Sequence, residues 1–144
     1  MTGSTYKSFG GPPSGMILSN SAELAERLDK IAFPGLTANF DLSRVAAMVI
    51  SVLDLLIHGQ EYARMCIANA KALAEALHTG GCEVFQVSGK GFANSKHVAV
   101  PAAAYGGGDT ASKQLEKANL LTSGISLPLP TIRGDFNAMR LGTK

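Results

Sequence analysis

The stretch Ser4–Gly15, STYKSFGGPPSG, decides how this sequence is interpreted. It places a lysine, Lys7, among hydroxyl residues and before a turn rich in glycine and proline. A lysine amine forms a covalent bond with a carbonyl compound when it is partly desolvated and held by a rigid turn. Hydroxyls at Ser4, Thr5 and Ser8 lie close enough in sequence to bind a phosphate or phenolate oxygen beside it. The stretch therefore indicates either a covalent catalyst or a solvated lysine in a flexible terminus.

The composition is that of an ordinary globular protein. The 144 residues are 46% hydrophobic and 17% charged, with a formal net charge of +2 and no basic run. Neither nucleic acid nor an anionic membrane is therefore expected as a partner. Cys66 and Cys82 follow no disulfide or metal pattern, which favours reduced thiols and a cytoplasmic location. The most apolar run, 45–57, is too short by itself to cross a bilayer.

The first part of the chain has the pattern of helices. The apolar run at 16–18 predicts a short buried strand, and Asn20 and Ser21 predict the cap of a helix that stops at Phe33–Gly35. From Asp41 to Gly81, apolar residues recur at helical spacing. This part predicts one long helix, or two that meet at the glycine in position 59.

The second part has the pattern of short strands around one helix. The helix is expected from Asp109 or Thr110 to Ala118. The sequence therefore predicts the α/β (α+β) class, with a boundary near residue 81 between a helical part, 1–81, and a small α+β part, 82–144. The strands are expected at 83–87, 97–101, 120–121, 125–129 and 139–141.

Two further polar features are candidate sites. Arg140 lies in a short apolar run, where its guanidinium can either bind a carboxylate by two parallel hydrogen bonds or form a surface ion pair. The run Gly106–Asp109 precedes the predicted helix and weakly suggests an anion site, although a plain loop is the simpler interpretation. The three histidines have no metal-ligand spacing, so no metal is expected.

Several motifs, in the same order, resemble the serine hydroxymethyltransferase family. Ser4–Gly15 resembles the segment T-T-H-K-[ST]-L-x-G-P-R-G-G that carries the cofactor lysine of that family. Asn137–Thr143 resembles S-G-[IL]-R-[IL]-G-T near its end. Between them, Phe33–Gly35, Asn69–Leu73 and Ala118–Leu120 resemble F-P-G, N-A-K-A-[LM] and A-N-[IL]. The resemblance covers essentially the whole chain.

The resemblance implies a fragment of a pyridoxal-phosphate-dependent transferase of fold type I. Residues 1–81 would form the end of the cofactor-binding large domain, and residues 82–144 most of a truncated small C-terminal domain. Family members are several hundred residues long, so only their C-terminal part is matched. Such a fragment is expected to form a homodimer or to need a complementing chain.

The resemblance also assigns roles to single residues. Lys7 would be the catalytic lysine that forms a Schiff base with pyridoxal 5'-phosphate, and Ser4 and Tyr6 would help to bind this cofactor. Arg140 would bind the carboxylate of an amino-acid substrate. The implied reaction is that of a hydroxymethyltransferase or aldolase acting on serine, glycine or a related β-hydroxy amino acid, with tetrahydrofolate as co-substrate in the family's main reaction.

Three positions depart from the family pattern. Tyr6 replaces a histidine, Pro13 an arginine, and Ala38–Asn39 a pair of glycines. These departures favour a divergent subgroup, such as an α-methylserine hydroxymethyltransferase or transaldolase. The alternative is a non-catalytic interaction or dimerisation module derived from the family, because most of the family's phosphate site precedes the position of Lys7.

Overall fold

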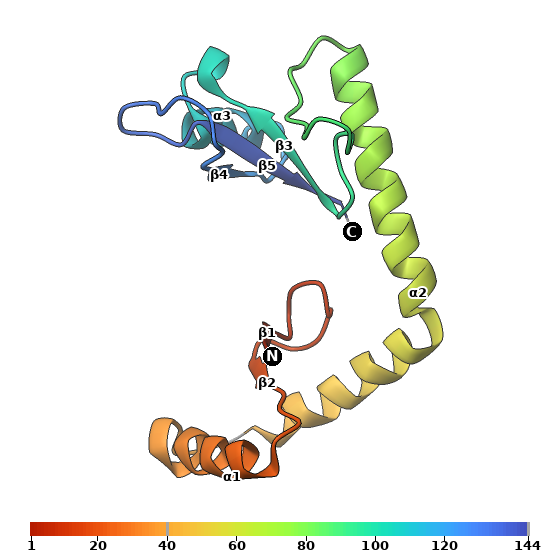
Figure 1. Cartoon of the computed structure of the whole chain (residues 1–144), viewed down its shortest axis with the longest axis vertical. Helices are drawn as coiled ribbons and strands as arrows, with labels where there is room; N and C mark the ends of the chain where they lie inside the picture. The colour runs from red at the N-terminus through yellow and green to blue at the C-terminus, as the bar shows by residue number, and fades with distance from the viewer. Residues whose placement is uncertain (40, 144) are drawn as a thin grey trace. The chain divides into compact units, whose positions relative to one another are not determined.

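The chain forms two compact units, Met1–Gln60 and Glu61–Lys144. The computed structural model, shown in Figure 1, describes residues 1–39 and 41–143. The two units meet inside helix α2 (Leu42–Thr79), whereas the sequence pattern changes near residue 81. The physical reason is that the second half of α2 supplies Ala70 and Ala74, both fully buried, to the core of the second unit.

The first unit opens with an antiparallel hairpin, β1 (Thr2–Ser4) and β2 (Gly15–Ile17). Helix α1 (Ala22–Lys30) follows, and the Ser21 hydroxyl accepts a hydrogen bond from the Leu24 N–H at 3.2 Å. This bond is the one expected of an N-cap serine, because it satisfies a helix-terminal N–H. The predicted helix start is confirmed, and a strand forms at the predicted place, but it is not buried, because Ile17 and Leu18 are each 54% exposed.

The turn η1 (Ile31–Leu36) ends α1 where the sequence places a proline. Phe33 leaves the helical conformation (φ −140°, ψ 126°), and the Phe33–Pro34 peptide bond is cis. Asp41 then starts α2, because its carboxylate accepts a hydrogen bond from the Ser43 N–H at 2.9 Å. Both boundaries agree with the sequence-based prediction.

Helix α2 runs unbroken through Gly59, and much of its first half is exposed. It is long and apolar enough to cross a membrane by length and composition alone, and its most apolar window is not buried. The run 45–57 is too short to cross a bilayer by itself, but the whole helix is not. One such helix is weak support for a membrane span, because core helices of soluble proteins pass the same test. Its exposed large apolar residues include Leu42, Val45, Val49, Ile50, Leu53, Leu56 and Ile57.

The second unit contains a three-stranded antiparallel sheet in the order β3-β5-β4. Strands β3 (His97–Pro101) and β5 (Ala138–Gly142) confirm two predictions, whereas β4 (Ser123–Ile125) lies earlier than the strand predicted at 125–129. Helix α3 (Gly108–Glu116) packs against this sheet (Figure 1). The core consists of Ala70, Ala74, Val84, Ala93, Val98, Val100, Ala111 and Met139.

Two predicted strands are not formed by the described residues. In the segment 83–87, the Phe85 N–H donates to the Ala99 carbonyl at 2.9 Å, but the segment does not pair as a strand. Val84 of this segment lies in the core, whereas Val87 is 52% exposed. Residues 120–121 belong to the connection that follows α3. An apolar pair so short carries too little periodicity to identify a strand.

A carboxylate from the same unit closes the start of α3. Asp135 accepts hydrogen bonds from the backbone N–H groups of Asp109 at 2.8 Å and Thr110 at 3.0 Å, and from the Thr110 hydroxyl at 2.7 Å. The bond from the Asp109 N–H is the largest of the causes that lower the pKa of Asp135 from 3.8 to about 2. The anion site suggested by Gly106–Asp109 is therefore filled by the protein's own side chain.

Replacing Asp135 by asparagine should lower the thermal midpoint of the second unit by several degrees at pH 7. Because folding lowers the pKa of this carboxyl, its stabilisation is complete above about pH 4 and is lost as the pH falls towards 2. Circular dichroism melts between pH 2 and 7 should therefore show a shallower acid dependence in Asp135→Asn. The control is Glu116→Gln, at an exposed acid of α3. Identical acid dependence in wild type and Asp135→Asn would contradict the prediction.

Candidate functional site

Lys7 lies on a closed loop between β1 and β2, which we call the lysine loop (Thr5–Ser14). The loop is closed by Thr5, whose side chain and backbone are 2% exposed. The Thr5 N–H donates to the Ser14 carbonyl at 3.0 Å. The Thr5 hydroxyl lies 2.5 Å from the Pro12 carbonyl oxygen and 2.9 Å from that of Ser14. The sequence suggested that this hydroxyl could bind a cofactor oxygen. In the structure it is used inside the loop and is not available to a cofactor.

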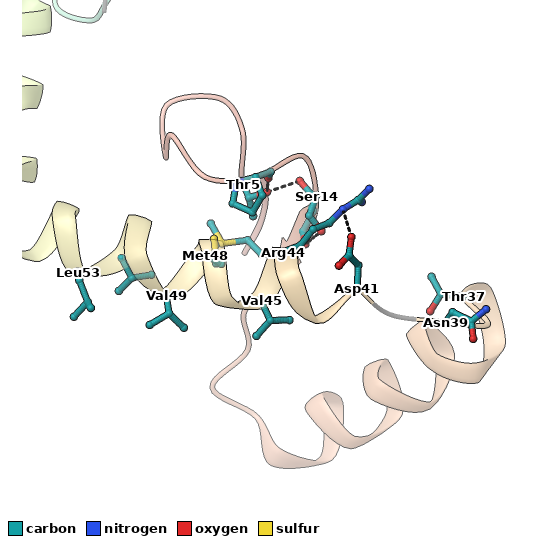
Figure 2. Close-up of a pocket in the computed structure, with 14 residues that line it drawn as sticks. Thr5, Ser14, Thr37, Asn39, Asp41, Arg44, Val45, Met48, Val49 and Leu53 are labelled. Atoms are coloured by element: carbon teal, nitrogen blue, oxygen red, sulfur yellow. Dashed lines mark hydrogen bonds and ion pairs between the residues drawn. The ribbon is translucent and has the colours of Figure 1, made fainter.

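The lysine loop is also attached to α2. Figure 2 shows Arg44 and Met48 on the side of the helix that faces the loop. Arg44 donates to the Pro13 carbonyl at 3.1 Å and pairs with Asp41 at 3.3 Å. A Cβ atom on Gly11 would lie 3.1 Å from the Met48 sulfur, so a glycine permits this close packing. The loop is thus held at both Gly11 and Pro13.

An open groove of about 850 Å³ lies beside the lysine loop, within the first unit. Val45, Val49 and Leu53 line it and point away from the loop in Figure 2. Ser4, Tyr6 and Lys7 are not among the described residues that line this groove. Its lining comprises Thr5, Pro12, Ser14, Gly15, Met16, Thr37, Asn39, Asp41, Arg44, Val45, Met48, Val49, Val52 and Leu53.

The residues predicted to bind the cofactor lie next to each other at one end of the hairpin. Ser4 ends β1 and is half-buried, whereas Tyr6 and Lys7 are exposed on the turn that follows. Lys7 is an exposed residue at a held turn, which fits the covalent attachment of pyridoxal phosphate. Arg44, a cation close to the loop, is already engaged by Asp41. The described residues of the first unit, 1–39 and 41–60, can therefore supply the lysine that attaches the cofactor. They do not supply a group of residues that would bind its phosphate.

Arg140 lies on the exposed face of the sheet in the second unit. In the strand register it pairs with Ala99 of β3 on one side and Ser123 of β4 on the other. The residues on either side of Arg140, Met139 and Leu141, turn towards the core. Arg140 itself is exposed, and none of the ion pairs within the described part of the chain involves it. Its guanidinium is therefore open to an anion such as a carboxylate.

Replacing Thr5 by valine should destabilise the first unit by about 1–2 kcal/mol, because the isosteric change removes a buried hydroxyl that two carbonyl oxygens share. Urea unfolding gives this free energy. The matched variant Thr5→Ser keeps the hydroxyl and should retain most of the stability. Hydrogen exchange at the Gly11 amide, which donates to the Thr5 carbonyl at 2.7 Å, should become faster only in Thr5→Val. Equal exchange in both variants would contradict the role of the hydroxyl.

Comparison with known proteins identifies relatives along nearly the whole chain. No family model matches it. The chain is 48% identical over 143 residues to an alpha-methylserine aldolase of Ralstonia sp, and 50% identical over 142 residues to one of Variovorax paradoxus. It is 41% identical over 146 residues to a serine hydroxymethyltransferase of Korarchaeum cryptofilum (strain OPF8). Each match covers 99% of this chain and 32–33% of the relative.

These matches confirm the resemblance, and the chain is homologous to enzymes of the serine hydroxymethyltransferase type. The relatives are enzymes by name, aldolases and hydroxymethyltransferases. The chain spans about one third of their length, which is consistent with the predicted C-terminal part. Its mixture of helices and sheets agrees with the predicted α/β class.

Proposed function

We propose that this chain is the lysine-bearing part of a pyridoxal-phosphate-dependent aldolase or hydroxymethyltransferase of fold type I. The observation that carries the proposal is the 48–50% identity to alpha-methylserine aldolases over 99% of the chain. The 41% identity to a hydroxymethyltransferase is lower, so we favour aldol cleavage of an α-substituted serine. Within this proposal the protein is cytoplasmic, residues 1–81 end the large domain, and residues 82–144 belong to the small domain.

The proposed cleavage of α-methylserine breaks the Cα–Cβ bond and yields alanine and formaldehyde. The hydroxymethyl group loses its O–H proton and leaves as formaldehyde, while Cα keeps the electron pair and takes up a proton. Pyridoxal phosphate, when bound, supplies the electron sink for that pair. Lys7 anchors the cofactor by its amine, flanked by Ser4 and Tyr6. Arg140 binds and orients the substrate carboxylate by charge-assisted hydrogen bonds.

The test supplies the part of the relatives that this chain does not match. The chain is combined with the remaining two thirds of the Variovorax paradoxus relative, pyridoxal phosphate and α-methylserine, and both alanine and formaldehyde are measured with and without tetrahydrofolate. Formaldehyde release without folate supports the aldolase. Turnover that requires tetrahydrofolate would instead assign a hydroxymethyltransferase. The control pairs the same two thirds with the relative's own last third, and activity in that control alone would contradict both assignments.

A non-catalytic interaction or dimerisation module is the second candidate, and the exposed face of α2 favours it. Leu56 is 77% and Ile57 74% exposed, and large apolar neighbours on the same helix are exposed as well. Apolar patches of this kind mark surfaces that another polypeptide covers. Light scattering distinguishes the candidates, because a stable dimer without affinity for pyridoxal phosphate supports the module. A chain that binds the cofactor saturably supports the enzyme, completed by a second copy or a complementing chain.

A further inference from the structure

His97 and Arg140 share one face of the β3-β5-β4 sheet. His97 pairs with Gly142, and Arg140 pairs with Ala99, so the two residues are diagonal neighbours across adjacent strands. Residues two apart on a strand point to the same face, which places both side chains opposite the buried Val98. A Cβ atom on Gly142 would lie 3.9 Å from Cδ2 of His97. The imidazole therefore extends over the glycine and towards the strand that carries Arg140.

Among residues 1–39 and 41–143, the cations near His97 form no ion pair with an acid. Partial burial, Arg140 on β5 and the adjacent Lys96 all lower the pKa of His97, in that order of effect. The ion pairs within residues 1–39 and 41–143 join Lys30 to Glu26, Arg44 to Asp41 and Arg64 to Glu61. None of them neutralises the group of cations around the imidazole. A bound anion would remove this electrostatic excess.

We propose that His97 and Arg140 together form a two-point site that binds the carboxylate of an amino acid. This inference rests on the proposed function, in which Arg140 binds that carboxylate. The bound anion offsets the charge of Arg140 and so favours the protonated imidazole. The imidazolium then donates a second charge-assisted hydrogen bond, which fixes the plane of the carboxylate. Ser123, opposite Arg140 on β4, adds a hydroxyl to the same face.

The first part of the test needs no ligand and is independent of the proposed function. The pKa of each histidine is measured by NMR in the full chain, with His58 and His78 of α2 as internal references. Arg140→Gln should raise the pKa of His97 by about half a unit, because it removes a nearby cation. The matched control Arg133→Gln should leave it unchanged. An unchanged His97 pKa in Arg140→Gln would overturn the inference, because the two groups would not be neighbours.

The second part uses formate as the probe, at ionic strength held constant with sodium chloride. Saturating formate should raise the pKa of His97 by about one unit, and formate should bind several-fold more tightly at pH 5 than at pH 8. His97→Gln should remove this pH dependence and retain binding at pH 8, whereas Arg140→Gln should abolish binding. Binding through Arg140 without a change at His97 would overturn the inference and leave the role of Arg140 intact. Absence of binding would overturn the site, while the formaldehyde assay still decides the proposed function.

Discussion

Replacing Gly108 by alanine is expected to destabilise the second unit by about 3 kcal/mol, enough to unfold a marginally stable unit of this size. Gly108 is buried at the start of α3, and its N–H donates to the Phe136 carbonyl at 2.8 Å. A Cβ atom at this position would overlap the carbonyl oxygen of Ala138 and lie 3.1 Å from the Cα atom of Gly124. Both neighbours are backbone atoms of the sheet, so α3 would have to move away from β5 and β4.

The measurement is urea unfolding followed by circular dichroism. The matched control is Gly59→Ala, the same substitution inside α2, where the added Cβ would lie 3.4 Å from the nearest side-chain atom of Leu55. That contact is ordinary, and alanine favours the helix, so the control should be stabilised by about 0.5–1 kcal/mol. A Gly108→Ala chain as stable as wild type would contradict the close approach of α3 to β5.

The helices could be predicted because their signals are local. The Ser21 hydroxyl bonds to a backbone N–H three residues away, and the Asp41 carboxylate to one two residues away. The irregular segment 83–87 could not be told from a strand, because five residues with a strand-like composition look the same whether or not their backbone pairs. The division of the chain inside α2 also has no local signal, since nothing in the sequence shows that Ala70 and Ala74 pack on a sheet formed later in the chain.

The candidate site shows the same division between local and distant signals. The lysine-bearing turn could be recognised from its residues alone, but its closure by Thr5 depends on contacts with Pro12 and Ser14 across the loop. The cap of α3 by Asp135 comes from 25 or 26 residues away. The glycine run before α3 is the sequence feature that relates to this cap. A glycine is needed there because a Cβ atom on Gly107 would overlap the Asp135 carboxylate.

Lys7 is expected to be the lysine that pyridoxal phosphate labels selectively when the full chain is titrated with the cofactor, reduced with borohydride and mapped by peptide. The lysine loop is held by Thr5 and by the contact of Arg44 with Pro13, so the amine is attached to an ordered turn. Lys30, the control lysine, lies on α1 and forms an ion pair with Glu26 at 2.7 Å. Lys7→Arg keeps the charge without the reactive amine, and should lose at least about nine-tenths of the label.

The same variant separates the two candidate functions. The second assay combines this chain with the remaining two thirds of the Variovorax paradoxus relative. In that enzyme Lys7→Arg should lower formaldehyde release on the order of a thousandfold, because the lysine that attaches the cofactor is lost. Lys30→Arg, the matched change at a surface lysine outside the loop, should leave both label and activity unchanged. Label spread evenly over the lysines, with Lys7→Arg indistinguishable from Lys30→Arg, would show that the loop does not select its amine. The lysine loop would then be a structural connection, and the exposed face of α2 would carry the function as an interaction surface.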